Sequence, residues 1–176
     1  MSVFVISDVW FNRLLPNDQD NSVVDKNNRI IDDWNSVVDT TDTVYVLGGF
    51  GISDLYNVIV RLNGTIRFLN NYFNYDERDF IKEMRSRIEK SGDVNFIRRI
   101  VFETDQIKVL ESYDSILSYF PLSDWSGKET GTYLFHGLNT DIDIEDHNYT
   151  SVYSYWKKPI DIMDIQKKTE GFKKVN

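Results

Sequence analysis

Short apolar runs alternate with helical patterns through the first half of the chain. Three runs rich in β-branched residues, Val3–Ser7, Thr43–Leu47 and Thr65–Leu69, predict buried strands. Between them, apolar residues recur at helical spacing over Ser22–Val38 and again after Ser53, which predicts two helices. This repeated order of strand, helix and strand favours a sheet of parallel strands with helices packed on it.

The pattern changes after one more predicted helix. Asn74 and Glu77 have the spacing of a capping box, and Gly92 is a stop signal. The apolar stripe of this helix contains Phe80, Ile81, Met84 and Ile88. From about residue 96, short runs predict strands that we interpret as an antiparallel second half. These runs are Ile97–Glu103, Gln106–Glu111, Ser115–Phe120, Thr132–His136 and Ser151–Tyr155.

The length of 176 residues suits one domain, which we expect to cover residues 1–165. Residues 166–176 carry four lysines and one glutamate, and we expect either a frayed tail or a basic segment that binds a partner. The chain has no long apolar run and no secretory leader pattern, so a cytoplasmic protein is expected.

Composition removes several kinds of chemistry. The chain has no cysteine, which excludes disulfides, thiolate metal sites and cysteine nucleophiles. Its two histidines, His136 and His147, cannot supply a three-imidazole metal centre. A formal net charge of −8 argues against general affinity for nucleic-acid backbones.

Motifs at the predicted strand ends resemble those of the calcineurin-like metallophosphoesterases, in particular the small single-domain proteins of bacteria and phages. The order of the matching segments holds from about residue 2 to residue 165. The segments read SDVWF at 7–11, WNSVV at 34–38, DTVYVLGGF at 42–50, LNG at 62–64, NNYF at 70–73, SYFPL at 118–122 and FHGLNT at 135–140. The resemblance implies an α/β fold of the α+β kind, a four-layer α/β/β/α sandwich of two mixed sheets with flanking helices.

That family hydrolyses phosphate esters with two metal ions about 3.5–4 Å apart, which activate a water molecule. Seven side chains supply the family's site, and by position this chain keeps two of them, Asp8 and Asn71. Two further residues, Tyr72 and Phe73, replace the family's histidine and aspartate in the motif that contains Asn71. The five replaced ligand positions hold Trp10, Gly49, Tyr119, Leu138 and Thr140.

Neither histidine stands at a ligand position of the resemblance. His136 aligns with the residue before the histidine motif, and His147 directly follows the acidic loop, residues 141–146, which matches no motif. Two close divalent ions repel each other and need several anionic or imidazole ligands. We therefore expect no metal, no cofactor and no catalysis, which makes the chain a pseudoenzyme of the family.

The retained residues have structural alternatives. Asp8 can cap the backbone after its strand, and Asn71 can bind loop amides, although a vestigial single-metal site on these two residues is also open. Asp161 and Asp164 follow a Lys-Pro-Ile segment that resembles the start of the family's last helix, where they are expected to act as first-turn acids.

The aromatic replacements leave three interpretations open. They can fill a pocket that no longer holds metal, they can form an exposed patch that binds a protein partner, or they can line a remodelled small-molecule pocket. The candidate partner-binding residues are Trp10, Tyr72, Phe73, Tyr119 and Phe120.

The expected function is a non-catalytic protein-binding or structural protein. The family's distribution suggests that a phage encodes it and that it acts in the host cytoplasm or the virion. The main alternative is a weak metal-dependent phosphatase or phosphodiesterase, or a nucleotide-binding module. A third is an acidic protein that mimics a polyanion and binds a basic protein. No membrane or nucleic-acid partner is expected.

Overall fold

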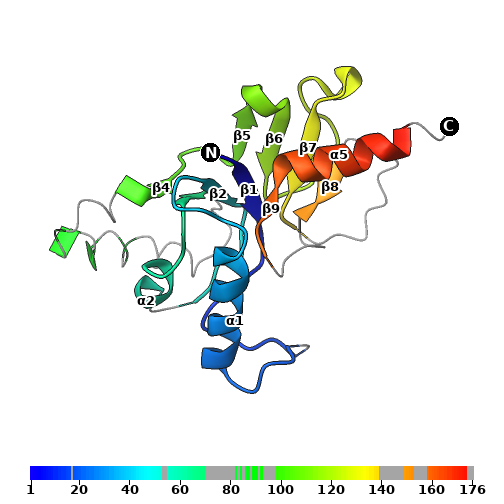
Figure 1. Cartoon of the computed structure of the whole chain (residues 1–176). Helices are drawn as coiled ribbons and strands as arrows, with labels where there is room; N and C mark the ends of the chain where they lie inside the picture. The colour runs from blue at the N-terminus through cyan, green and yellow to red at the C-terminus, as the bar shows by residue number, and fades with distance from the viewer. Residues whose placement is uncertain are drawn as a thin grey trace.

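The computed structural model describes residues 1–16, 18–52, 55–69, 98–138, 149–152 and 158–173, together with positions 82, 84, 86, 87, 89, 90 and 92. For residues 149–151 and 169–173 only the backbone is described. The chain forms a mixed α/β fold with two sheets, and the predicted α+β class is confirmed at this level (Figure 1).

The first sheet has the strand order β4-β3-β2-β1-β9. Its strands are β1 (Val3–Ile6), β2 (Thr43–Val46), β3 (Thr65–Phe68), β4 (Ile100–Phe102) and β9 (Ile160–Asp161). The first four strands run parallel, and β9 pairs antiparallel with β1. The three strands predicted in the first half are therefore confirmed, as is their parallel arrangement.

Helices α1 (Val23–Asn35) and α2 (Tyr56–Ile59) pack on one face of this sheet (Figure 1). The Ser22 hydroxyl accepts a hydrogen bond from the Asp25 N–H at 3.1 Å and caps α1. Ser53, the expected start of the second helix, lies outside the described residues. In the predicted third helix, positions 82, 84, 86, 87, 89 and 90 are described and are helical. Its other predicted residues, Asn74, Glu77, Phe80, Ile81 and Ile88, also lie outside the described residues. The core under these helices includes Ile30, Trp34, Phe50, Ile59, Leu62, Ile66 and Met84.

The second sheet has the order β5-β6-β7-β8. Its strands are β5 (Ile107–Leu110), β6 (Ser115–Ser118), β7 (Tyr133–His136) and β8 (Tyr149–Ser151). Short 3₁₀ turns cover Glu111–Tyr113 and Lys128–Thr130.

The expectation of an antiparallel second half is wrong for most of these strands. Among the described strands of the second sheet, β5 and β6 pair antiparallel, whereas β6, β7 and β8 run parallel to one another. β4 also departs from the expectation, because it joins the first sheet in parallel with β3. The segments 119–132 and 137–148 are long enough to return the chain to the start of a parallel neighbour, which a hairpin cannot do.

The two sheets face each other across a second core. Val5, Leu47, Leu117 and Phe135 belong to this cluster, together with Ile162 of the last helix. On the outer face of the second sheet, Ile116 and Leu134 pack against Leu122 and Trp125. Leu122 and Trp125 lie in the segment between β6 and β7, so an irregular segment supplies the described residues that cover this face.

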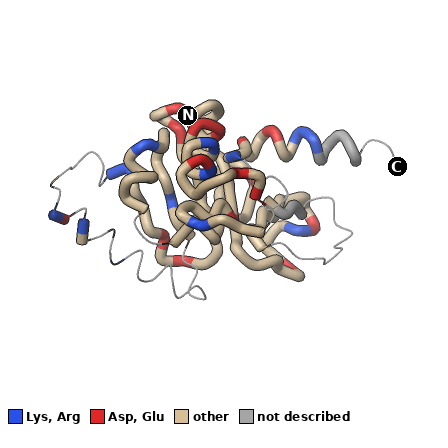
Figure 2. Tube along the Cα trace, turned by 90° about the horizontal axis from the view of Figure 1, so that it is seen from below, with Lys and Arg blue, Asp and Glu red and all other residues tan. Residues whose placement is uncertain are grey.

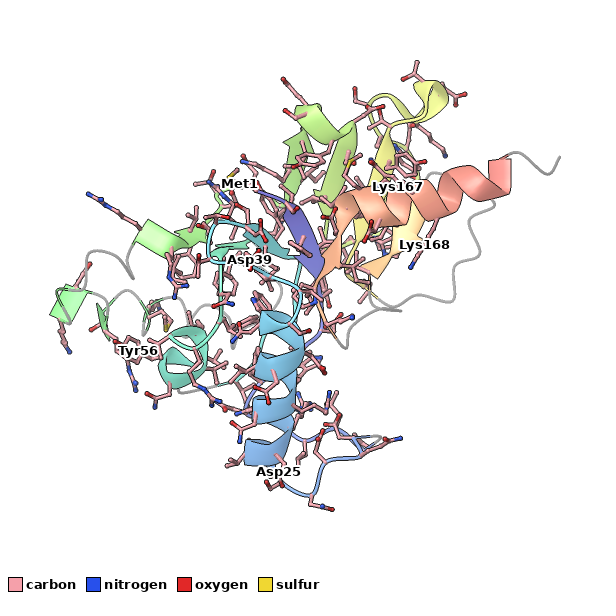
Figure 3. The ribbon with its side chains drawn as sticks, viewed as in Figure 1. Met1, Asp25, Asp39, Tyr56, Lys167 and Lys168 are labelled. Atoms are coloured by element: carbon pink, nitrogen blue, oxygen red, sulfur yellow. The ribbon has the colours of Figure 1, made fainter. Side chains whose placement is uncertain are left out.

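Helix α5 (Ile162–Lys173) ends the described chain. The expectation of a frayed tail from residue 166 is wrong for residues 166–173, which continue this helix; Figure 3 labels Lys167 and Lys168 on it. The Gln166 Nε2 donates to the Tyr113 carbonyl at 2.7 Å and to the Ser115 hydroxyl at 2.9 Å, so the helix is tied to the second sheet. Asp164 lies in the first turn as predicted, while Asp161 precedes the helix and accepts from the Met163 N–H at 2.8 Å.

Charged residues of both signs are interspersed along the described trace (Figure 2). Within the described residues, no helix has the length and apolar character needed to cross a membrane. Two apolar side chains of the edge strand β5 are exposed, Ile107 and Val109.

Candidate functional site

The loops that follow β1 and β2 lie side by side. The Asp8 N–H donates to the Gly48 carbonyl, the Trp10 N–H to the Gly49 carbonyl and the Phe11 N–H to the Phe50 carbonyl, each at 2.9 Å. These bonds continue the pairing of the parallel strands beyond their ends. The two loops lie together because the carboxyl ends of neighbouring parallel strands meet at one edge of a sheet, where ligands of such sheets commonly bind.

The loop after β1 has an unusual backbone. Asp8, Trp10 and Asn12 have φ angles of 55°, 54° and 59°, in the left-handed region that side chains other than glycine seldom adopt. Aspartate and asparagine tolerate this region better than tryptophan does. Hydrogen bonds to the neighbouring loop hold Asp8 and Trp10 in this conformation, and bonds with Asn27 of α1 hold Asn12, so the surrounding structure stabilises a strained segment at the strand end.

Gly49 packs directly against Asp8. Its φ angle is +57°, and a Cβ atom at this position would overlap the Asp8 carboxylate and lie 2.7 Å from the Asp8 Cα. A glycine is required on both grounds. In the resemblance this position carries the aspartate that bridges two metals, and here the space beside Asp8 does not admit a side chain.

The second sheet meets the first at this same edge. A Cβ atom on Gly137 would lie 3.0 Å from the Leu47 Cβ and 3.0 Å from the Tyr119 ring, and it would also meet the Ser7 hydroxyl. The Leu138 N–H donates to the Tyr119 carbonyl at 2.8 Å. The ends of β1, β2, β6 and β7 therefore converge, and we call this region the strand-end site.

The structure thus brings together some of the site residues that the sequence predicts. Asp8, Trp10, Gly49, Tyr119 and Leu138 contribute to the strand-end site, and Phe120 follows directly on Tyr119. The other predicted positions lie outside the described residues. They are Asn71, Tyr72, Phe73, Thr140, His147 and the acidic loop 141–146.

Asp8 is a buried carboxyl group. Its side chain accepts a hydrogen bond from the Ser7 hydroxyl at 3.1 Å, and the residue is 6% exposed. Burial raises the pKa of Asp8 to about 6, although the Ser7 hydrogen bond acts in the opposite direction. Among the described residues, no group of three or more histidine, aspartate or glutamate side chains is placed to hold a metal ion.

His136 lies at the end of β7 and is 1% exposed. Burial lowers the pKa of His136 to about 4, although a backbone hydrogen bond with Leu138 acts in the opposite direction. The imidazole is therefore neutral at physiological pH and belongs to the interior of the second sheet.

The described aromatic residues at the site are half-buried and are not part of a buried core. Trp10, Tyr119 and Phe120 all have this intermediate exposure. The Tyr119 and Phe120 rings form an edge-to-face pair with centroids 4.9 Å apart, and the Arg13 guanidinium lies 5.2 Å from the centroid of the Trp10 ring. Each ring therefore keeps one part packed and another part accessible to solvent.

Sequence reasoning missed the polar network that supports this loop. The Lys26 side chain is 0% exposed and its ammonium donates to the Asp18 carboxylate and to the Arg13 carbonyl, both at 2.8 Å. Asn27 binds Asn12 twice, through its carbonyl oxygen at 3.0 Å and its amide nitrogen at 2.6 Å. A signal was available, since Lys26 lies one helical turn before Ile30 on the apolar face of α1.

Comparison with known proteins supports the fold only. No family model matches the chain, and no curated protein shows significant similarity to it. Among solved structures, the protein of unknown function AQ665 from Aquifex aeolicus superposes with a TM-score of 0.59. The match covers 94% of this chain and 98% of that one at 18% identity, so the two chains share an overall fold.

Proposed function

We propose that this chain is a non-catalytic relative of the calcineurin-like metallophosphoesterases, with their four-layer sandwich, and that it binds another protein through the strand-end site. The observation that carries the proposal is the contact between Gly49 and Asp8. A two-metal centre needs a bridging carboxylate there, and the left-handed backbone and the closeness of Asp8 leave no room for one.

The donor set supports the same conclusion. Asp8 supplies one carboxyl group. Trp10, Tyr119 and Leu138 offer no imidazole where the resemblance has histidines. These residues do not fit a pair of divalent ions, which need several anionic or imidazole ligands.

The half-exposed rings support protein binding. Tryptophan, tyrosine and phenylalanine are enriched at protein interfaces, where a partly packed ring loses little conformational freedom on binding. The rings follow strands of two sheets, and hydrogen bonds fix the backbone of Trp10, through its N–H to Gly49, and of Tyr119, through its carbonyl to Leu138. A preorganised aromatic surface of this kind favours a protein partner with a complementary apolar patch.

The absence of catalysis is tested with Mn²⁺ and Ni²⁺. We expect isothermal titration to show no tight binding of two metals per chain, and no hydrolysis of a generic phosphodiester in the presence of either metal. Gly49→Asp should not create metal binding, because its side chain would meet Asp8 on a left-handed backbone. Binding of two metals to the natural chain, with phosphodiesterase activity, would show that the chain is an enzyme.

Partner binding is tested with Phe120→Ala. Proteins captured from the source cells by the natural chain should be depleted with this variant, because truncation of an interface aromatic typically costs about 2 kcal/mol or more. Val109→Ala is the matched control, since it removes exposed apolar surface from β5. A partner lost equally from both variants, or retained by both, contradicts a role for the strand-end site.

A further inference from the structure

A pocket of about 380 Å³ lies between α1 and α2 and reaches the loop after β1 at Asn12, and its described lining contains none of the residues assigned to the strand-end site. Figure 3 shows the two helices side by side, with Asp25 marking the amino-terminal part of α1 and Tyr56 marking α2. The volume is in the range of small-molecule sites. Its lining consists of Asn12, Val23, Val24, Asn27, Asn28, Asn57, Val58 and Arg61.

The lining has a distinctive composition. Among the described lining residues, four carry side-chain amides, three are valines, one is an arginine and none is acidic. The whole chain has 28 acidic residues and a net charge of −8, so this described lining, with one cation and no acid, differs from the composition of the chain as a whole. Its local charge favours an anionic ligand.

Arg61 is the cation of the pocket. It is exposed, and within the described part of the chain no carboxylate forms an ion pair with its guanidinium. Its backbone is fixed, since its N–H donates to the Val58 carbonyl at 3.0 Å and its carbonyl accepts from the Asn35 amide at 2.9 Å. A guanidinium on a fixed backbone presents a planar set of donors that matches a carboxylate or a phosphate.

The rest of the lining complements this cation. The reciprocal Asn12–Asn27 pair holds the loop after β1 against α1 and so fixes one wall. Asn28 and Asn57, on the two helices, carry amide groups that can donate to an oxyanion. The valines Val23, Val24 and Val58 supply an apolar wall, which suits a ligand with a short hydrocarbon part.

We propose that this pocket binds a small oxyanion, a carboxylate or a phosphate ester with a short apolar group, through Arg61 and the amides of Asn28 and Asn57. The site is distinct from the strand-end site and does not depend on the protein-binding proposal. It makes the chain a small-molecule binder as well as a scaffold.

The test follows amide chemical shifts of the full chain by NMR during titration with inorganic phosphate, with isobutyrate and with neutral isobutyramide. The two anions should shift the side-chain amides of Asn28 and Asn57, and isobutyramide should not. A stronger effect of isobutyrate identifies a carboxylate with an apolar group as the preferred chemistry, and a stronger effect of phosphate identifies a phosphate ester.

Two variants of the pocket give the decisive comparison. Arg61→Gln should weaken anion binding by about tenfold or more, because a charge-assisted hydrogen bond is lost. Asn57→Asp keeps the shape of an exposed side chain and should weaken binding to a similar extent by repulsion. Arg98→Gln is the matched control, because it removes the same charge from an exposed arginine outside the pocket and should leave binding nearly unchanged.

The proposal is overturned if neither anion shifts these amides at millimolar concentration. It is also overturned if Arg61→Gln and Arg98→Gln reduce the shifts equally, which would indicate a general response to anions. Far-ultraviolet circular dichroism of each variant confirms that a lost shift comes from the pocket and not from unfolding.

Discussion

A Lys26→Met variant is expected to lose about 3–5 kcal/mol of unfolding free energy, since removal of one partner leaves a buried charge uncompensated. The side chains of Lys26 and Asp18 are 0% and 2% exposed. Burial alone would raise the pKa of Asp18, but hydrogen bonds from the Leu15 N–H and from Lys26 lower it below its ordinary value. Methionine removes the cation and also the donor to the Arg13 carbonyl. Urea unfolding followed by circular dichroism measures the loss.

Two controls separate charge from packing. Lys167→Met removes an ammonium whose side chain is 69% exposed, and it should change stability by no more than about 0.5 kcal/mol. Adding Asp18→Asn to Lys26→Met should restore part of the loss, because the orphaned carboxylate is then neutral. Equal stability of Lys26→Met and the natural chain would mean that the ion pair is not buried in solution.

The pH dependence of stability is expected to contain two opposing contributions, one from buried Asp8 and one from buried His136. Asp8 has a raised pKa, so the native state keeps a proton that the unfolded chain releases, and this group makes the protein less stable as pH rises toward about 6. His136 has a lowered pKa, so the unfolded chain binds a proton at a pH at which the native imidazole stays neutral. This group therefore makes the protein less stable as pH falls toward about 4. Each effect is about 3 kcal/mol in full, and the two oppose each other.

Replacing Asp8 or His136 alone should leave the contribution of the other group, so the two variants should change in stability in opposite directions as pH falls. Between about pH 4.5 and 6, Asp8→Asn should lose roughly 2 kcal/mol of stability on acidification, and His136→Gln should gain about the same amount. The natural chain should change less than either variant in this window. The lowered pKa values of Asp18, Asp20, Asp42 and Glu103 affect stability at lower pH. Parallel pH profiles for the two variants would contradict the burial of one of the two groups.

The first sheet was largely predictable because its strands are continuous apolar runs separated by helical patterns. The direction of the strands in the second sheet was not predictable. Periodicity indicates where a strand lies, but the direction of that strand depends on how the preceding connection crosses the sheet. The segment between β6 and β7 carries Trp125 over the outer face, and no local signal distinguishes that path from a wide hairpin. β9 is two residues long, too short for any periodic pattern.

The strand-end site was predictable in position and less so in detail. The approach of Asp8 to Gly49 follows from the rule that parallel strands end at a common edge. The left-handed backbone of Trp10 does not follow from that rule, because it results from hydrogen bonds to the neighbouring loop rather than from the local sequence. The burial of Lys26 depends on Asp18 in a loop, which a helical pattern alone does not reveal.

The pairing of β1 with β9 has a consequence for how the chain folds during its synthesis. β1 leaves the ribosome long before β9, one of its two neighbours, which is among the last described segments to emerge. Until then the nascent chain has an open strand edge at β1, and the side chains of Val3 and Val5 lack the cover of Ile162 and Ile165. Translation of the final helix thus closes the fold, and stalled ribosomes would hold a sheet ready to pair with other chains.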